Sequence, residues 1–451
     1  MSTRRWSWTL SKVEARHWTK RRPGSDGPGS PHLLGPKLAT GGEGARLPVR
    51  GFANIQRIKE GHMAPLAEDF KIIDADTHYT EPYDLWTSRA PKGYENRVLH
   101  IEERDGLATW VVDGNEIGFA RGGGVVARDS SKLPFLDALE RGLDWVHEGA
   151  FDPQARLRLM DECGVHAQVL FPNVVGLGGS TLNNVIPDES LRMLCLQIYN
   201  DAMAEIMTSS GNRFIPMTLM PAWNVDLCIE ETRRASGLGL RGINMTSDPQ
   251  DAGSPDLADR AWDPLWKVCS DLNMPVHFHI GSSNTAMDFF GNYFWASQDE
   301  YVKPAIGGGM LFLNSARVVM NTIFSGVFDR FPDLTMVAVE SGIGWIPFIL
   351  ETMDYELAEN APNHFEAMKY KPSEYFAKNW YATFWFEEGH GQLQSLMDIV
   401  GDDRILFETD FPHPTCLYPS PVESVAEKMG ALRPETQARV MGDNARKLYR
   451  L

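Results

Sequence analysis

The feature that most constrains the fold is an alternation, after residue 63, of short apolar β-branched runs with stretches of helical periodicity. Such alternation is typical of βα units that build a parallel sheet. Eight runs have the length and composition of buried strands, which predicts a closed (β/α)8 barrel, the TIM barrel. The predicted strands are Phe70–Asp76, Ala167–Pro172, Phe214–Leu219, Arg241–Met245, Pro275–Ile280, Thr335–Glu340, Trp380–Phe386 and Arg404–Glu408.

Helical patterns lie between these runs, and two insertions interrupt them. Residues 97–121 predict a small β-meander, because Asp105-Gly106 and Asp113-Gly114 are turn signals. Residues 282–309 follow the fifth strand and predict a lid or substrate wall, since active sites form at this end of a barrel. The clearest helices are expected at Pro187–Ser210, Val225–Ser236, Ala261–Asn273, Trp345–Ala358 and Gln392–Val400, with a closing helix at Arg433–Tyr449.

Residues 1–62 differ from the rest of the chain in composition. They hold 12 Lys/Arg against 4 Asp/Glu and are rich in Gly, Pro and Ser. This composition predicts a disordered leader, and it lacks the apolar region of a secretion signal. Lys59-Glu60-Gly61 can be encoded as a bacterial ribosome-binding sequence, so we hypothesise that translation of the native protein begins at Met63. A genuine flexible arm is the alternative, and residues 63–451 are expected to form the barrel domain.

The charge and the cysteines exclude several classes of protein. The net charge of −17 argues against a nucleic-acid surface, and no apolar run approaches the roughly 20 residues of a membrane span. The five cysteines form no CxxC pair, so neither a disulfide framework nor a zinc knuckle is indicated. We expect a cytoplasmic protein that acts on a small molecule, and homo-oligomerisation is left open.

Ionisable side chains gather at the carboxyl ends of the first, fifth, sixth and eighth predicted strands. Alternate residues on a strand share one face, so several of these groups can point into the barrel together. Burying them costs several kcal/mol unless they are paired or bind a metal, which predicts a metal centre. The residues are Asp74, Asp76, His78, His277, His279, Glu340, Asp410 and His413.

These motifs resemble the amidohydrolase-2 family, which includes the aminocarboxymuconate-semialdehyde and resorcylate decarboxylases. The resemblance covers roughly residues 70–450 and implies a (β/α)8 barrel in which His78, His279 and Asp410 bind metal. It is carried by Ile73-Asp74 with His78 and Glu81-Pro82, Pro275-Val276 with His279 and Gly281, Phe331-Pro332-Asp333-Leu334, and Thr409-Asp410-Phe411-Pro412-His413.

Two positions depart from the family pattern. In the family, the motif on the first strand often begins His-x-His, where this chain has Asp76-x-His78. Its decarboxylases usually carry a proton-donating histidine at the end of the sixth strand, where this chain has Glu340, and a carboxylate of ordinary pKa is a poor proton donor at neutral pH. Many dinuclear amidohydrolases bridge their two metal ions with a carboxylated lysine from the fourth strand, and the fourth strand here has no lysine. We therefore interpret Glu340 as the carboxylate that bridges two metal ions.

The predicted ligand set mixes carboxylates and imidazoles, which suits iron or manganese at least as well as zinc. We expect two divalent ions, with iron favoured and zinc or manganese as alternatives. The predicted ligands are Asp76, His78, His277, His279, Glu340 and Asp410, although His277 lies one pleat deeper and fits a supporting role equally well. The predicted catalytic residues are Asp410, Glu340 and His413. A wide apolar pocket is expected from Trp295, Trp345, Trp385 and Phe411.

A finer resemblance is carried by Glu340-Ser341-Gly342-Ile343-Gly344-Trp345 and by residues 407–414. These segments are similar to the amidohydrolase-fold nonheme diiron monooxygenases of platensimycin and platencin biosynthesis. That resemblance implies O2-dependent hydroxylation of a bulky, diterpenoid-like acid or its coenzyme A thioester, with an external electron donor. The alternatives are a metal-dependent hydrolase with Asp410 as general base and, less favoured, a non-oxidative decarboxylase.

Overall fold

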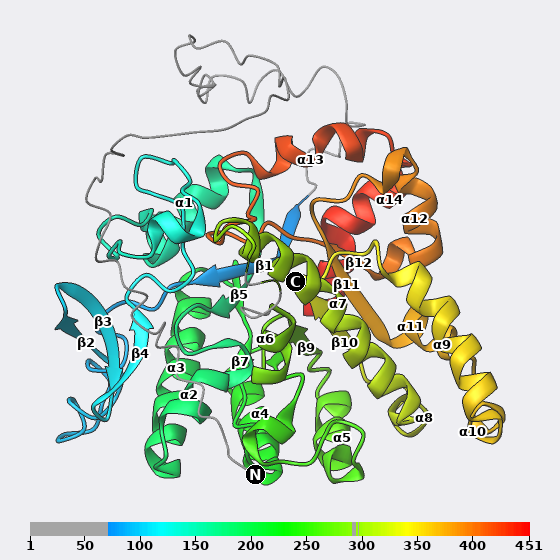
Figure 1. Cartoon of the computed structure of the whole chain (residues 1–451), viewed down its shortest axis with the longest axis horizontal. Coiled ribbons are helices and arrows are strands. Elements are labelled where there is room, and N and C mark those ends of the chain that lie inside the picture. Colours follow the sequence, from blue (N-terminus) through cyan, green and yellow to red (C-terminus); the bar gives the residue numbers. More distant parts are fainter. Residues whose placement is uncertain (1–70, 291–294, 296) are drawn as a thin grey trace, which may run out of the picture. The chain divides into compact units, whose positions relative to one another are not determined.

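The computed structural model describes residues 71–290, 295 and 297–451, and its central feature is a ring of parallel strands (Figure 1). β6 and β7 are two halves of one strand, because β6 pairs with β5, β7 pairs with β8, and only Met217 separates them. The described residues therefore supply eight barrel strands. In chain order these are β1 (Ile72–Tyr79), β5 (Val165–Pro172), β6 (Phe214–Pro216) with β7 (Thr218–Leu219), β8 (Ile243–Asn244), β9 (Val276–His279), β10 (Met336–Val339), β11 (Trp380–Phe384) and β12 (Ile405–Phe407).

The ring is closed by backbone contacts at two places. One sheet has the order β1-β5-β6 and the other β12-β11-β10-β9-β8-β7, and the two join at Met217, whose N–H donates to Leu170 at 3.0 Å. Thr77 and Phe411 form a parallel bridge between the end of β1 and the chain just past β12. The predicted (β/α)8 barrel is confirmed.

Alternate strand residues fill the interior of the barrel, and the C-terminal helix covers the end where the strands begin. Ile73, Val169, Val337 and Leu406 are fully buried in one apolar cluster with Tyr449. Tyr449 ends α15 (Asn444–Tyr449), which follows α14 (Pro434–Ala438) and a π-helical turn, where the sequence predicts the closing helix. The floor is therefore sealed, and the carboxyl ends of the strands remain as the mouth.

Helices cover the outside of the strands, and the five clearest helical patterns are confirmed (Figure 1). A long helix between β9 and β10, α7, was not predicted, because Pro304 and three consecutive glycines from Gly307 interrupt its pattern. Among the described residues, no helix is both long enough and apolar enough to cross a membrane. The longer helices are α1 (Pro153–Glu162), α3 (Glu189–Ser209), α4 (Val225–Gly237), α5 (Asp263–Asp271), α7 (Val302–Phe324), α9 (Ile346–Asn360), α11 (Pro372–Asn379), α12 (Leu393–Val400) and α13 (Pro421–Gly430).

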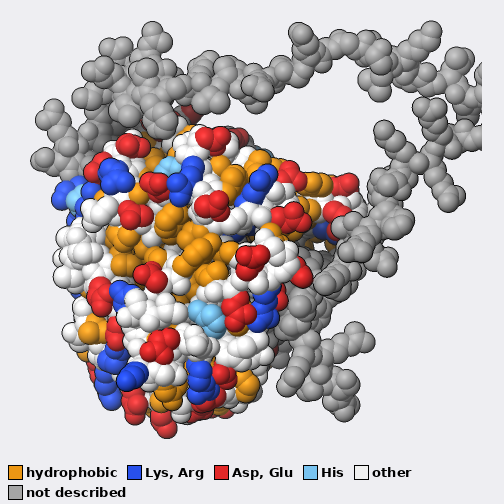
Figure 2. All heavy atoms as spheres, turned by 90° about the vertical axis from the view of Figure 1, so that its left-hand side faces the viewer, with side chains coloured by type: hydrophobic (Ala, Val, Ile, Leu, Met, Phe, Trp, Pro, Cys, Tyr) orange, Lys and Arg blue, Asp and Glu red, His pale blue; other side chains and the backbone are white. Residues whose placement is uncertain are grey.

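The first insertion is the predicted meander of β2 (His100–Arg104), β3 (Leu107–Val112) and β4 (Asn115–Phe119), drawn in blue and cyan in Figure 1. Asp105 and Asp113 adopt positive φ angles of 53° and 47°, and a glycine follows each, as the hairpin turns require. On the face that Figure 2 shows, the described acidic and basic side chains are interspersed around an apolar area, and no basic stripe stands out.

The second insertion begins with α6 (Asn284–Phe290) and ends inside α7, so it is largely helical where it is described. Part of the expected lid lies outside the described residues, as does the whole predicted leader, residues 1–62.

Candidate metal centre

The end of β1 contributes two side chains to the mouth of the barrel. Asp76 and His78 are fully buried, and Asp76 Oδ1 lies 3.8 Å from His78 Nε2. His78 Nδ1 lies 3.1 Å from the carbonyl oxygen of Pro172, which fixes the ring by accepting its N–H. The lone pair of Nε2 is therefore directed at the carboxylates, as in a metal-binding imidazole.

The ends of β9 and β10 supply the opposite wall. His279 Nε2 lies 3.3 Å from Asp76 Oδ2 and 3.6 Å from Glu340 Oε2. His279 Nδ1 lies 2.8 Å from the carbonyl oxygen of Ile280, so this ring is oriented by the backbone in the same way as His78. Three residues from three different strands thus converge on one point.

Asp410 and His413 complete the mouth from the segment after β12. Asp410 Oδ2 accepts a hydrogen bond from Thr415 at 2.8 Å, and Oδ1 lies 3.5 Å from His78 Nε2 and 3.1 Å from His413 Nδ1. The His413 ring stacks on His78 with centroids 3.7 Å apart. One carboxylate oxygen is thus anchored by the protein, while the other faces the cluster.

Several ligand atoms in this cluster are buried without a hydrogen-bond partner. They are both carboxylate oxygens of Asp76, Oδ1 of Asp410, and Nε2 of His78 and of His279. Buried polar groups without partners are costly and rare, so their convergence is itself a sign that something else binds them. Carboxylate oxygens and imidazole nitrogens are suitable ligands for a divalent metal ion.

The electrostatics of the cluster also favour a cation. Burial raises the pKa of Asp76 well above its usual value, and Asp410 and Asp74 raise it further. The pKa of Glu340 is raised well above its usual value by burial, then by Asp410 and Asp76. Burial lowers the pKa of His279 to about 4, although the Ile280 carbonyl and Asp410 act to raise it, so the ring is neutral at pH 7 and cannot offset the carboxylate charge. A divalent ion would remove the repulsion between these carboxylates.

The ligand atoms form two overlapping groups. Asp76, His78, His279 and Glu340 make one, and His78, Glu340, Asp410 and His413 make the other, with the atoms of each group within 4.8 Å of one another. His78 and Glu340 belong to both groups, so the cluster has room for one shared ion or two neighbouring ones.

Two of the carboxylates sit on strained backbone. Glu340 and Asp410 adopt φ angles of 53° and 58°, in the left-handed region that non-glycine residues seldom occupy. Such conformations cost about 1–3 kcal/mol and cluster at functional sites, where the surrounding structure enforces them. Glu340 directly follows β10 and Asp410 lies three residues past the end of β12, and both side chains belong to the ligand groups at the mouth.

The structure places the other predicted site residues elsewhere. His277 lies one pleat deeper, with Nδ1 3.1 Å from the Ile243 carbonyl oxygen and Nε2 2.9 Å from the Tyr449 hydroxyl, so both of its nitrogens are occupied. His277 therefore supports the barrel floor and is not brought into either ligand group. The sequence leaves that supporting role open.

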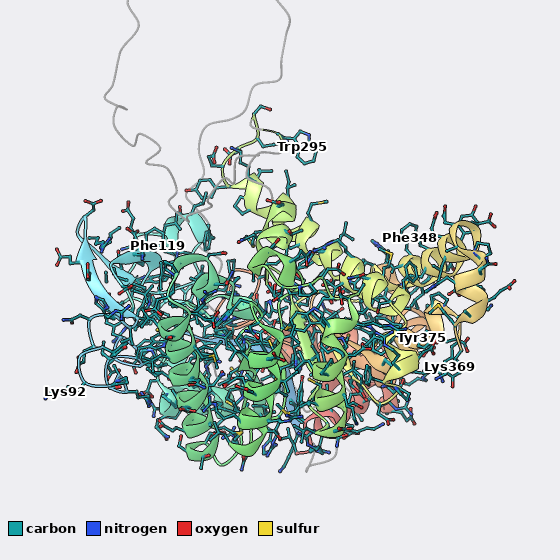
Figure 3. The ribbon with its side chains drawn as sticks, turned by 90° about the horizontal axis from the view of Figure 1, so that it is seen from below. Lys92, Phe119, Trp295, Phe348, Lys369 and Tyr375 are labelled. Carbon is teal, nitrogen blue, oxygen red and sulfur yellow. The ribbon has the colours of Figure 1, made fainter. Side chains whose placement is uncertain are left out.

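The predicted aromatic pocket is not assembled. Trp295 is 62% exposed and projects from the body (Figure 3). The Trp345 indole donates to Ser341 at the start of α9, and Trp385 is buried against Phe312. Phe411 packs outside the barrel, where it lines a small surface pocket next to α1. The sequence shows that these rings lie near strand ends, but it does not show which way they turn.

Sequence reasoning missed Arg156 and Glu408, which support the ligands. Arg156 is fully buried, donates to the His78 carbonyl oxygen at 2.6 Å and lies over the Phe411 ring at 4.6 Å, so it ties β1 to the segment after β12. Glu408 accepts a hydrogen bond from the Glu340 N–H at 3.3 Å. Glu408 could have been found as a carboxylate two residues before Asp410, whereas nothing marks Arg156 within its helix.

The sequence profile of the family described as Amidohydrolase (Amidohydro_2) matches residues 73–451. The chain belongs to this family. A gamma-resorcylate decarboxylase of Rhizobium sp. (strain MTP-10005) is 26% identical over 312 residues, which are 66% of this chain and 86% of that protein. A 2-amino-3-carboxymuconate-6-semialdehyde decarboxylase of Dictyostelium discoideum is 24% identical over 369 residues, which are 80% of this chain and 89% of that protein.

A solved structure has the same fold as this chain. It is the 5-carboxyvanillate decarboxylase of Novosphingobium aromaticivorans DSM 12444, complexed with manganese and 4-hydroxy-3-methoxy-5-nitrobenzoic acid. The TM-score is 0.59 at 16% identity, and the match covers 85% of this chain and 97% of that chain.

These relatives contradict the expectation of O2-dependent hydroxylation at a diiron centre, because they are decarboxylases within this family. The finer resemblance to the platensimycin and platencin enzymes is not confirmed. The expectation failed because carboxylate and imidazole ligands fit several reactions, so the ligand types alone do not select one. The coenzyme A thioester and the external electron donor depended on hydroxylation and have no other support.

Proposed function

We propose that the protein catalyses the metal-dependent, non-oxidative decarboxylation of an aromatic acid. The observation that carries the proposal is the converging group of Asp76, His78, His279 and Glu340, in which Asp76, His78 and His279 present buried ligand atoms without protein hydrogen-bond partners. Two relatives from different organisms are named as decarboxylases, and a solved structure with this fold contains manganese and a nitrobenzoic acid.

A divalent ion would be held by His78 and His279 through Nε2 and by the carboxylates of Asp76, Asp410 and Glu340, with manganese as the first ion to test. When bound, it would supply a positive charge that holds the substrate carboxylate and offsets negative charge as carbon dioxide leaves. Arg156 and the Pro172 carbonyl hold His78 in place, and His78 would in turn set the position of the ion and of the acid bound to it.

The reaction breaks one carbon–carbon bond and needs one proton to replace carbon dioxide on the ring carbon. His413 is the residue best placed to hold that proton. Its Nε2 lies 3.0 Å from Asn173 Oδ1, which also accepts the Gly123 N–H and so acts as an acceptor. Nε2 is therefore the donor, and Nδ1, 3.1 Å from Asp410 Oδ1, is the nitrogen that can gain and release a proton.

The test is to incubate manganese-loaded protein with 2,6-dihydroxybenzoate, 5-carboxyvanillate and further hydroxylated benzoic acids, and to measure carbon dioxide and the ring product. In D2O, the product is expected to carry one deuterium at the carbon that lost the carboxylate. His413→Ala is expected to lower kcat by about 10²- to 10⁴-fold while the bound manganese is retained.

Hydrolysis is the second candidate, favoured by the two overlapping ligand groups, which could hold two ions around a water molecule. The same preparation should therefore be assayed with aromatic amides and lactones. Hydrolysis of these compounds without carbon dioxide release from any acid would overturn the decarboxylase proposal.

A further inference from the structure

Glu408 is a buried acid that takes no part in the chemistry described above. It directly follows β12 and its side chain is fully buried. Its Oε2 accepts the Glu340 N–H at 3.3 Å, although β11 lies between β12 and β10 in the sheet. A side chain that spans two strand positions must run through the barrel interior, so Glu408 lies beneath the candidate metal centre.

The residue that Glu408 contacts needs support. Glu340 has a φ angle of 53°, and a left-handed conformation in a non-glycine residue persists only where neighbouring groups enforce it. Its N–H points away from the ladder that ends at Val339, and the Glu408 carboxylate is the acceptor that the structure provides for it. The Glu340 side chain is thereby left free to approach His279, at 3.6 Å.

Glu408 does not itself bind the cation in this arrangement. Neither group of converging ligand atoms among the described residues includes it. Its remaining oxygen, Oε1, is buried without a hydrogen-bond partner, and Asp76 and Asp410 both act on it electrostatically. A carboxylate in such a place is unfavourable by itself, so its presence there calls for an explanation.

We propose that Glu408 is a positioning residue, which holds Glu340 in its left-handed conformation so that the Glu340 carboxylate can bind the metal ion. This inference rests on the metal centre of the proposed function but not on the identity of the reaction. Residues that orient metal ligands typically change metal affinity by 10- to 100-fold when they are replaced.

Two conservative variants separate the effect of the length of the Glu408 side chain from the effect of its charge. Glu408→Gln keeps the length and an acceptor oxygen but loses the charge, whereas Glu408→Asp keeps the charge and is one methylene too short to reach the Glu340 N–H. The dissociation constant for Mn2+ is measured by calorimetric titration of the full chain, and circular dichroism of the metal-free protein checks the fold. Glu231→Gln, a buried glutamate of α4 that pairs with Arg234, is the matched control.

We expect Glu408→Asp to weaken Mn2+ binding 10- to 100-fold, and Glu408→Gln and Glu231→Gln to change it by less than about threefold. In a Glu340→Ala background, Glu408→Asp should add no further loss. Weakening by the Gln variant that equals or exceeds the weakening by the Asp variant would overturn the positioning role, and unchanged affinity in both would overturn any role. A wild-type protein that binds no divalent ion would contradict the metal centre and this inference together, whereas absence of decarboxylation with normal metal binding would leave only the reaction in doubt.

Discussion

At the scale of single residues, most candidate ligands have one polar atom that is hydrogen-bonded to the protein and a second that is left for the metal ion. His78 and His279 each give one ring nitrogen to a backbone carbonyl and keep the other free, and Asp410 gives one oxygen to Thr415. Asp76 is the exception, since neither of its oxygens has a partner. Asp74, two residues earlier on the same strand, instead accepts bonds from Thr409 and Gln168. The two aspartates should therefore respond to substitution in opposite ways.

Asp76→Asn is expected to weaken Mn2+ binding by at least 10-fold and to stabilise the metal-free protein, because it removes a buried charge that repels Asp410. Asp74→Asn should destabilise the protein by about 1–3 kcal/mol, since its new amide would face hydrogen-bond donors. Denaturant unfolding with chelator present measures both effects. A metal-free Asp76→Asn protein less stable than wild type would contradict this account.

Glu81 gives a prediction for pH dependence away from the ligands. Burial raises its pKa to about 7, although it accepts N–H groups from Val174 and Val175. A carboxyl group with a raised folded-state pKa binds protons more tightly when folded, so its contribution is present below about pH 4.5 and is lost as pH rises through about 7. Glu81→Gln cannot ionise and should gain stability relative to wild type between pH 5 and pH 8, by roughly 3 kcal/mol at most. A constant difference across that range in urea unfolding would refute the assignment.

At the scale of elements, the strands could be predicted from sequence because buried parallel strands leave continuous apolar runs. The turns of the meander could be predicted equally well, since Asp-Gly is one of the few pairs that suit two successive positive φ angles. α7 could not be predicted, because glycines and a proline interrupt its helical periodicity. Tertiary packing nevertheless makes the segment helical. For the site, alternation on β1 and β9 placed the ligands, but the directions of Trp295, Trp345 and Phe411 depend on packing that no local pattern records.

The meander offers a test of its turns. Gly106 has a φ angle of 81° and open space around its Cα, so Gly106→Ala would add only backbone strain. We expect a loss of about 1 kcal/mol in the free energy of unfolding. Gly237→Ala at the end of α4 also meets open space but has no positive φ, so it should be neutral or stabilising by up to about 1 kcal/mol. Equal effects of the two substitutions on the melting temperature would contradict the turn assignment.

At the scale of the whole molecule, the barrel closes where the candidate ligands lie. The Asp410 N–H donates to the Asp76 carbonyl oxygen at 2.9 Å, and the His78 N–H donates to that of Phe411 at 2.7 Å. An ion bound by the same residues would link β1, β9, β10 and the end of β12. The closure and the metal site are therefore expected to stabilise each other.

Mn2+ is expected to raise the melting temperature by several degrees, because a ligand at 100 times its dissociation constant stabilises the folded state by about 2.7 kcal/mol. Excess chelator should reverse the rise. In Asp76→Asn the same Mn2+ concentration should shift the melting temperature far less. A shift of equal size in that variant would show that the ion stabilises the protein elsewhere.

The hypothesis that the native chain begins at Met63 gives a prediction for the whole fold. The described strands complete the barrel from residue 72 onward, so a chain starting at Met63 should fold with an unchanged melting temperature and bind the same amount of Mn2+. Differential scanning calorimetry and metal analysis of the two chains would test it. A drop of several degrees would show that residues 1–62 contribute to the fold.

The most direct test of the central claim is a crystal structure of the Mn2+-loaded protein with anomalous diffraction data collected at the manganese edge. We expect a strong anomalous peak in the barrel mouth, from an ion bound by Nε2 of His78, Nε2 of His279 and the Asp76 carboxylate. A peak elsewhere, or a mouth in which these atoms bind only protein groups or water, would contradict it.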